Sequence, residues 1–198
     1  MLSRRSFMLS GLAIGGAALT GCKTAPSSYE YAELTYTHLP PYNLLVRDVV
    51  VDQAYVSPAK SPNVEHLFDI SPAQASARWA KDRLYPQGNN NVLNFVIKNA
   101  AVTESELEQQ KGITGLFTYD QSERYTGVLE VELQVLSDQG FNEASVVAKA
   151  ERSVTVAENI KLRDREKVWY KLTEDLMTEI DRQLQQGIAK HLGQYVLP

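Results

Sequence analysis

The chain has 198 residues, of which 43% are hydrophobic and 22% are charged, and its formal net charge is −4. This composition is typical of a globular domain and excludes a disordered or collagen-like chain. The net negative charge argues against a nucleic-acid partner. The single cysteine excludes an internal disulfide and any multi-cysteine metal or iron–sulfur site.

The first residues predict a secretory signal. Arg4 and Arg5 precede an uncharged apolar run of 13 residues, from Phe7 to Leu19. A membrane-spanning helix needs about 20 apolar residues, so this run fits the apolar core of a signal peptide instead. We therefore expect residues 1–21 to be cleaved.

The run ends in Leu19-Thr20-Gly21-Cys22, which resembles the lipobox of bacterial lipoproteins. In that family a diacylglycerol is attached to the cysteine thiol, and a signal peptidase then cuts before the cysteine. The resemblance implies that the peptidase recognises Leu19, Thr20 and Gly21 and that Cys22 carries the lipid. Two or three acyl chains such as palmitate would make a stable anchor, because one chain binds a bilayer only marginally. The alternative is that Cys22 is an ordinary buried cysteine.

The segment Ser3-Arg4-Arg5-Ser6-Phe7-Met8 also resembles the twin-arginine export motif, with Leu9 in place of the usual trailing lysine. The resemblance implies export of a folded domain through Arg4, Arg5 and Phe7. The alternative is a general secretory signal. In similar Gram-negative lipoproteins, aspartate after the lipidated cysteine favours the inner membrane. Lys23 therefore favours the periplasmic face of the outer membrane over the inner membrane.

Residues 22–42 are expected to form a lipidated tether, which begins with prolines and serines and ends at Pro40-Pro41. Fully extended, such a segment reaches about 65 Å. Tyr36, Leu39 and other apolar residues leave two alternatives open, a free tether and a segment that packs on the domain. Residues 43–198 are expected to form one globular domain. Removal of residues 1–21 takes away two arginines and no acidic residue, so the mature side-chain charge is −6.

The first strand and the first helix follow the tether. Residues 44–51 are rich in β-branched side chains and predict a strand. Ser71-Pro72-Ala73-Gln74 has the pattern of a capping box and predicts a helix that ends near Leu84. The side chains expected to face inward are Ala73, Ala77, Ala80 and Leu84.

Three further strands are predicted by alternation of apolar and polar residues. The first covers 93–97 and is followed by a polar connection, 103–111, in which Glu104, Glu106 and Glu108 are expected to be solvated. The clearest alternation covers 125–135 and 144–156, on either side of a turn at 137–140. These two segments predict a long antiparallel hairpin.

The chain closes with a predicted long helix over 161–192. Its apolar stripe recurs at steps of three or four residues and consists of Trp169, Leu172, Leu176, Ile180, Leu184, Ile188 and Leu192. The opposite, polar side is expected to carry Lys167, Lys171, Glu174, Asp181 and Arg182. Together the elements predict an α+β fold of two layers. In it, a mainly antiparallel sheet (β-α-β-β-β-α) is covered by two helices, the C-terminal one long.

No pattern in the sequence predicts catalysis, a metal site or a cofactor. His38, His66 and His191 lack the i, i+4 spacing of a zinc-protease helix, and no serine lies in a G-x-S-x-G turn. The segment 117–125 mixes aromatic residues with an arginine, and Phe117, Tyr119 and Arg124 are candidates for a partner-binding surface. The alternative is a loop that packs its aromatics on the helix layer, with Glu123 and Arg124 neutralising each other.

With the elements in this order, the chain resembles small periplasmic lipoproteins of Gram-negative bacteria. The nearest in organisation are auxiliary lipoproteins of lipid-transport ABC systems and lipoproteins that help to assemble outer-membrane machines. The shared features are the lipobox, a tether, a leading strand, a helix with a Trp79-Ala80 pair, a hairpin and a long closing helix. The resemblance implies a non-enzymatic accessory or scaffold role with an envelope protein as partner. The alternatives are a carrier with a hydrophobic ligand between sheet and helices, and an enzyme. The oligomeric state is left open.

Overall fold

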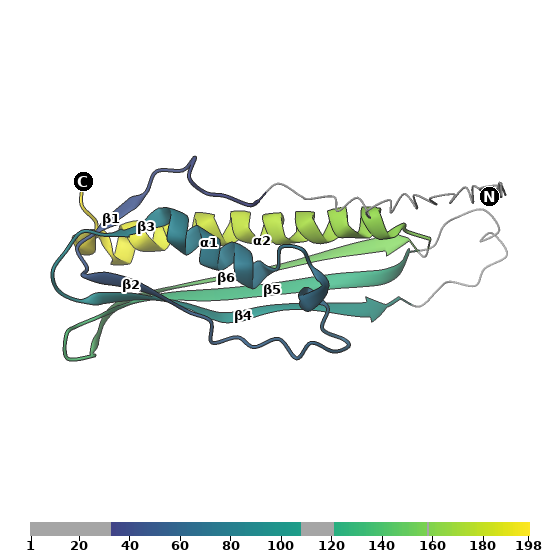
Figure 1. Ribbon diagram of the computed structural model, residues 1–198, viewed down its shortest axis with the longest axis horizontal. Coiled ribbons are helices and arrows are strands. Elements are labelled where there is room, and N and C mark those ends of the chain that lie inside the picture. The colour runs from purple at the N-terminus through teal and green to yellow at the C-terminus, as the bar shows by residue number, and fades with distance from the viewer. Residues whose placement is uncertain (1–32, 108–120, 158) are drawn as a thin grey trace, which may run out of the picture.

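The computed structural model describes residues 33–107, 121–157 and 159–198. The predictions made for residues 1–32 and 108–120 therefore lie outside the described residues. Figure 1 shows the elements in chain order. They are β1 (Tyr42–Leu44), β2 (Asp48–Asp52), the 3-10 turn η1 (Glu65–Leu67), α1 (Pro72–Arg83), β3 (Leu84–Pro86), β4 (Val92–Glu106), β5 (Gln121–Leu136), β6 (Asn142–Ala157), α2 (Leu162–His191) and the 3-10 turn η3 (Gly193–Tyr195).

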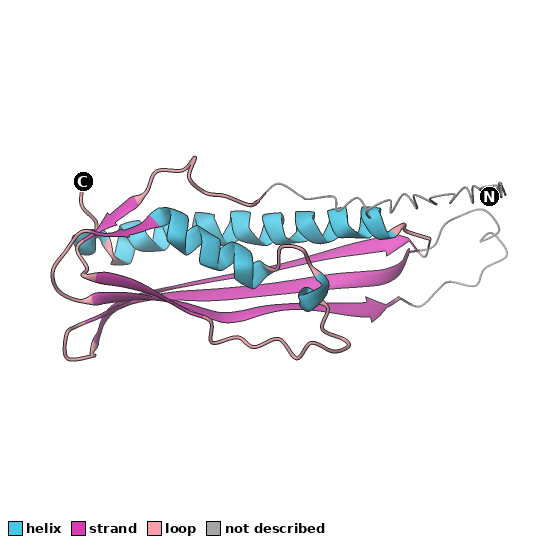
Figure 2. Cartoon of the chain, in the orientation of Figure 1, coloured by secondary structure: helices cyan, strands magenta, loops and turns pink. Residues whose placement is uncertain are grey.

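Four strands form the main sheet in the order β2-β4-β5-β6. Strand β2 runs parallel to β4, whereas β4, β5 and β6 are antiparallel neighbours. Both helices lie on the same side of this sheet, and α2 extends along most of its length (Figures 1 and 2). The predicted α+β fold with a long C-terminal helix is therefore confirmed. The short strands β1 and β3 form a second, parallel pair.

The core lies between the helices and the inner face of the sheet. On β5 the odd-numbered residues from 125 to 135 are buried, as the alternation predicts, and Tyr125, Leu129 and Leu133 are fully enclosed. All seven residues of the predicted stripe, six on α2 and the seventh at its C-cap, are buried as well. Gly127 allows the close contact between the layers, because a Cβ atom there would lie 2.8 Å from the side chain of Leu176. The predicted hairpin and helix stripe are thus confirmed.

Helix α1 begins where the sequence predicts but presents a different face. Ser71 and Gln74 form the reciprocal capping box, with hydrogen bonds of 3.3 and 2.9 Å. The buried side chains include Trp79, Ala80 and Arg83, while Ala73 and Ala77 are only half-buried. The predicted alanine face is therefore wrong in part. Trp79 stacks on Phe95 with 5.7 Å between ring centroids, and burial of its large ring sets the rotation of the helix.

Strand β4 is longer than its apolar pattern suggests. It continues through Glu106, so the residues 103–106 that were expected in a polar connection are paired with β5. The hydrogen bonds between the two strands satisfy the backbone N–H and C=O groups of these residues, whatever their side chains are. The predicted first strand is in turn divided into β1 and β2 by a bend at residues 45–47.

The described part of the predicted tether packs on the domain. Tyr36 is buried, and its backbone N–H donates a hydrogen bond of 2.9 Å to Asp82 of α1. Leu34, Leu39 and Tyr42 pack against the core as well. For residues 33–42 the packed alternative is therefore the observed one. Among the described residues, no helix is both long enough and apolar enough to cross a membrane.

Candidate functional site

Most of the predicted site residues lie outside the described part of the chain. These are Arg4, Arg5, Phe7, Leu19, Thr20, Gly21, Cys22, Phe117 and Tyr119. Arg124 is described and is exposed on β5. Glu123 does not neutralise it, because adjacent strand residues point to opposite faces of a sheet. Glu123 pairs instead with Arg165 of α2, with 2.9 Å between Nη2 and Oε2.

Glu123 belongs to a cluster of polar groups at the end of the sheet. The hydroxyl of Tyr125 donates to Glu123 over 2.9 Å, and Glu104 lies opposite Tyr125 in the register of β4 and β5. Partial burial, together with the negative charge of Glu123, raises the pKa of Glu104 above its ordinary value. Glu104 was expected to be a solvated carboxylate, and its half-buried position follows from the extension of β4.

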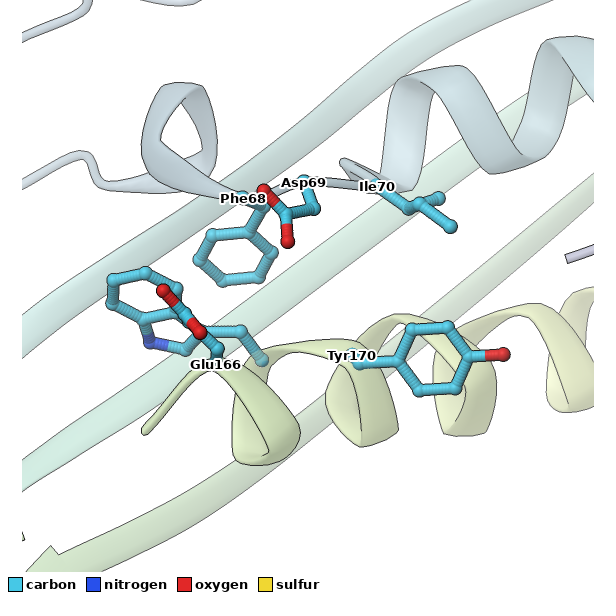
Figure 3. A pocket seen from close by; sticks show the side chains of 6 residues that line it. Phe68, Asp69, Ile70, Glu166 and Tyr170 are labelled. Carbon is cyan, nitrogen blue, oxygen red and sulfur yellow. The ribbon is translucent and has the colours of Figure 1, made fainter. Parts of the chain in front are cut away.

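An aromatic stack closes this end of the core. The rings of Phe68 and Trp169 are stacked with centroids 4.8 Å apart, and Tyr125 meets Trp169 edge-on at 5.8 Å. Figure 3 shows the small cavity beside this stack, between the segment at Phe68 and helix α2. Its volume is about 10 Å³, which is room for about one water molecule. The cavity therefore cannot hold an organic ligand.

A second polar cluster joins the two helices. The guanidinium of Arg83 and the indole N–H of Trp79 both bond to Oδ1 of Asp181, at 2.8 and 2.7 Å. Arg83 also lies over the ring of Tyr42, 4.9 Å from its centroid. Asp181 was assigned to the polar side of α2, and this assignment is wrong. The cluster ties α1, α2 and the N-terminal segment together, so its role is structural.

The β4 edge is covered by the connection between β2 and η1. Tyr55 and Val64 donate backbone hydrogen bonds to Ile97 and Val102 of β4, at 2.9 and 2.8 Å. Below this connection, the buried carboxylate of Glu65 accepts hydrogen bonds from Tyr55, Ser57 and the Val102 N–H, at 2.7, 2.5 and 3.0 Å. Burial by itself would raise the pKa of Glu65, but these donors outweigh it and hold the pKa below its ordinary value.

Strand β2 is left partly uncovered. Val50 and Val51 are 43% and 38% exposed. A groove of about 580 Å³ lies between β2 and α1, and its apolar lining comes from Val49, Val51, Ala77, Ala80 and Leu84. Asp48 and Lys81 lie at its rim. The groove opens to the surface and is the described feature best suited to contact another molecule.

A smaller groove of about 240 Å³ lies between β6 and α2. Three cations line it, and each is paired with an acid. Arg152 lies 3.6 Å from Glu179, Lys167 lies 3.3 Å from Asp164, and Lys171 lies 2.7 Å from Glu174. Their charges are therefore compensated within the chain.

The histidines and acids form no metal site in the described part of the chain. His38, His66 and His191 are exposed and lie far apart in the sequence. No group of three or more histidine, cysteine or acidic residues could hold a metal ion there.

Neither a protein-family model nor a curated protein matches this sequence. Among solved structures, the chain is similar to a minor lipoprotein from Acinetobacter baumannii. The two are 14% identical, and the TM-score is 0.37. The similar region covers 78% of this chain and 98% of that one.

Proposed function

We propose that this chain is a lipoprotein anchored through Cys22 to the periplasmic face of the outer membrane. In this proposal it acts without catalysis of its own, as an accessory or scaffold component of an envelope complex for transport or outer-membrane assembly. The support for the anchor is the sequence Leu19-Thr20-Gly21-Cys22, which follows a short apolar run and two arginines. The twin-arginine-like residues Arg4, Arg5 and Phe7 support export of the folded domain.

The observation that carries the scaffold role is the contrast between a filled interior and an open edge. The helix–sheet interface is occupied by large side chains such as Trp79, Phe95 and Leu133, none of which is exposed to solvent. By contrast, Val50 and Val51 of β2 are partly exposed, and the groove beside β2 opens to the surface. Exposed apolar surface next to polar residues is typical of protein-binding sites. This distribution suits a protein that holds other proteins.

The second candidate function is a carrier for a lipid or another small hydrophobic ligand. The groove beside β2 favours it, since a volume of about 580 Å³ would accommodate an acyl chain. The ligand would lie in a surface groove rather than within the core. Binding of a fluorescent fatty acid that Val51→Asp abolishes would support this second function.

Lipidation is tested by metabolic labelling with an alkyne analogue of palmitate in the natural host. We expect label on the wild-type protein and none on Cys22→Ser, which should also leave the membrane fraction. A matched control combines Cys22→Ser with Ser27→Cys, which moves the thiol away from the lipobox and should not restore the label. Labelling of either variant would contradict the anchor.

Export is tested by Arg4→Lys together with Arg5→Lys. Twin-arginine transport should stop, and the protein should stay in the cytoplasm with its signal uncleaved. Unimpaired export would indicate the general secretory route.

The scaffold role is tested by cross-linking in intact cells and purification with Cys22 present. Recovery of a defined envelope protein is expected, and recovery of none would contradict the scaffold role.

A further inference from the structure

Within the described residues, backbone groups on the outer side of β2 have no backbone partner. The N–H of Arg47, just before β2, points to the β4 side and donates to Asn90 and Asn91 at 2.9 Å. The N–H of Tyr55, after β2, also points to this side and donates to Ile97 at 2.9 Å. Successive residues of a strand direct their backbone groups to opposite sides. The N–H and C=O groups of Asp48, Val50 and Asp52 therefore point away from β4.

A few residues earlier, strand β1 of the two-stranded sheet already pairs with another segment of the chain on its free side. The C-terminal segment runs antiparallel along β1, where the N–H of Leu45 donates to the carbonyl of Tyr195 at 2.7 Å. The N–H of Leu197 donates to the carbonyl of Asn43 at 2.8 Å. This segment covers β1 and leaves β2 uncovered. A further strand on β2 would continue an arrangement that the chain itself uses.

The groove beside β2 would receive side chains from such a strand. Val49 and Val51 point to the inner face and form the groove with Ala77, Ala80 and Leu84 of the α1 region. Side chains two residues apart on an added strand would lie on this same face. Backbone bonds would supply affinity, and the groove would select apolar residues at alternate positions.

The charges on β2 favour a basic partner over a second copy of this chain. Asp48 and Asp52 are exposed, and no described cation forms an ion pair with either. If two copies of β2 paired antiparallel about Val50, Asp48 of one would face Asp52 of the other. Like charges directly opposite each other are destabilising. A lysine or arginine of a partner strand that lies opposite Asp48 or Asp52 would instead be attracted.

We propose that β2 accepts an extended segment of a partner protein as a fifth strand of the sheet. The segment has apolar residues facing the groove and basic residues opposite Asp48 and Asp52. The proposal deepens the scaffold role and takes its biological meaning from it, but strand binding does not require lipid on Cys22. The palmitate-labelling test above and the peptide-binding test below can therefore fail independently of each other.

The test uses the protein purified in detergent and two fluorescent peptides. One contains Lys-Val-Val-Val-Lys and the other Asp-Val-Val-Val-Asp, each flanked by serines. In fluorescence anisotropy we expect the basic peptide to bind about tenfold more tightly than the acidic one. Hydrogen exchange of the bound protein should slow at Asp48, Val50 and Asp52, and not at Ser153 of β6.

Two variants give the result a matched control. Val50→Pro removes an N–H that points away from β4, which an edge strand tolerates, and should abolish binding of the basic peptide. Val147→Pro makes the same change on the β6 edge and should leave binding unchanged. If Val50→Pro melts far below the wild type, Asp48→Lys with Asp52→Lys replaces it and should reverse the preference between the peptides.

Several outcomes would overturn the proposal. These are no binding of the basic peptide at about 1 mM, equal binding of both peptides, or full binding by both Val50→Pro and the charge-reversed variant. Dimerisation of the protein with protection of β2 would instead assign the edge to a second copy. Displacement of the basic peptide by decanoate, with no slowing of exchange at Val50, would assign the groove to a small ligand.

Discussion

The two long edges of the sheet are closed by different chemistry. On β6, Gln183 of α2 accepts a hydrogen bond from the N–H of Lys149 at 3.0 Å and donates to its carbonyl at 2.8 Å. On β4, a folded connection adds its own backbone and depends on the buried carboxylate of Glu65. One side chain of α2 thus protects the β6 edge. The β4 edge is instead covered by a connection that the carboxylate of Glu65 holds in place. Strand β2 is left where neither device reaches, and uncovered edges are the sites where sheets gain strands.

The largest expected effect comes from removing the support of the β4 edge. Glu65→Ala should lower the free energy of unfolding by about 3 kcal/mol, because the buried N–H of Val102 and two hydroxyls lose their acceptor. Urea unfolding measures this loss. Glu151→Ala, at an exposed position on β6, is the control and should cost less than about 0.5 kcal/mol. Equal losses in the two variants would remove the distinction between the edges.

A smaller loss is expected on the β6 edge. Gln183→Ala removes both hydrogen bonds to Lys149 and should cost about 1 to 2 kcal/mol. Hydrogen exchange at Lys149 should become faster at the same time. Gln186→Ala is the matched control on the same helix, since Gln186 bonds only to the exposed Arg182 in the described structure. If Gln186→Ala changed the hydrogen exchange as Gln183→Ala does, the protection of Lys149 would come from the helix as a whole.

The β4 edge should also respond to acid. The folded pKa of Glu65 lies below its ordinary value, so the unfolded chain binds a proton more readily than the folded one. The stabilisation is present above the unfolded pKa and is lost as the pH falls through the folded pKa. The raised pKa of Glu104 acts in the opposite direction, because stability there falls as the pH rises. Urea unfolding between about pH 3 and 7 should show a shallower acid loss in Glu65→Gln than in the wild type.

The smallest change in stability is expected at the uncovered edge. Val50→Lys places a charge where the valine is already 43% exposed and should change the free energy of unfolding by less than about 0.5 kcal/mol. The same substitution should abolish binding of the basic peptide. The matched change Val147→Lys on β6 should affect neither quantity. A large loss of stability in Val50→Lys would mean that this edge is already in use within the fold.

The sequence predicts the parts of the fold whose patterns are long. The stripe on α2 and the hairpin of β5 and β6 repeat over many residues, so their buried faces can be assigned from periodicity. The face of α1 could not be assigned in this way, because Trp79 sets its rotation by contact with Phe95 of a later strand. The extension of β4 through Glu106 likewise depends on pairing with β5. The polar residues at the end of β4 do not by themselves indicate a strand.

The polar clusters were missed because their members are distant in the sequence. Glu65 meets Tyr55 and Val102, and Asp181 meets Arg83, across 10 to 98 residues of chain. Local patterns carry no information on such pairs. Of the predicted site residues, the described chain contains only Arg124, which is exposed, and its partner-binding role stays a prediction. A run of three valines between two aspartates was the available signal for the β2 edge.

The packing of Tyr36 against α1 limits how far the domain can lie from a membrane in which Cys22 is anchored. Tyr36 is the fourteenth residue after Cys22, and fourteen steps of about 3.3 Å span about 46 Å when the chain is fully extended. With an anchor at Cys22, Tyr36 can lie no farther than this from the bilayer surface, which is about 20 Å less than a tether running to residue 42 would allow. A partner that binds β2 would then meet a domain whose residue Tyr36 is held within about 46 Å of the membrane.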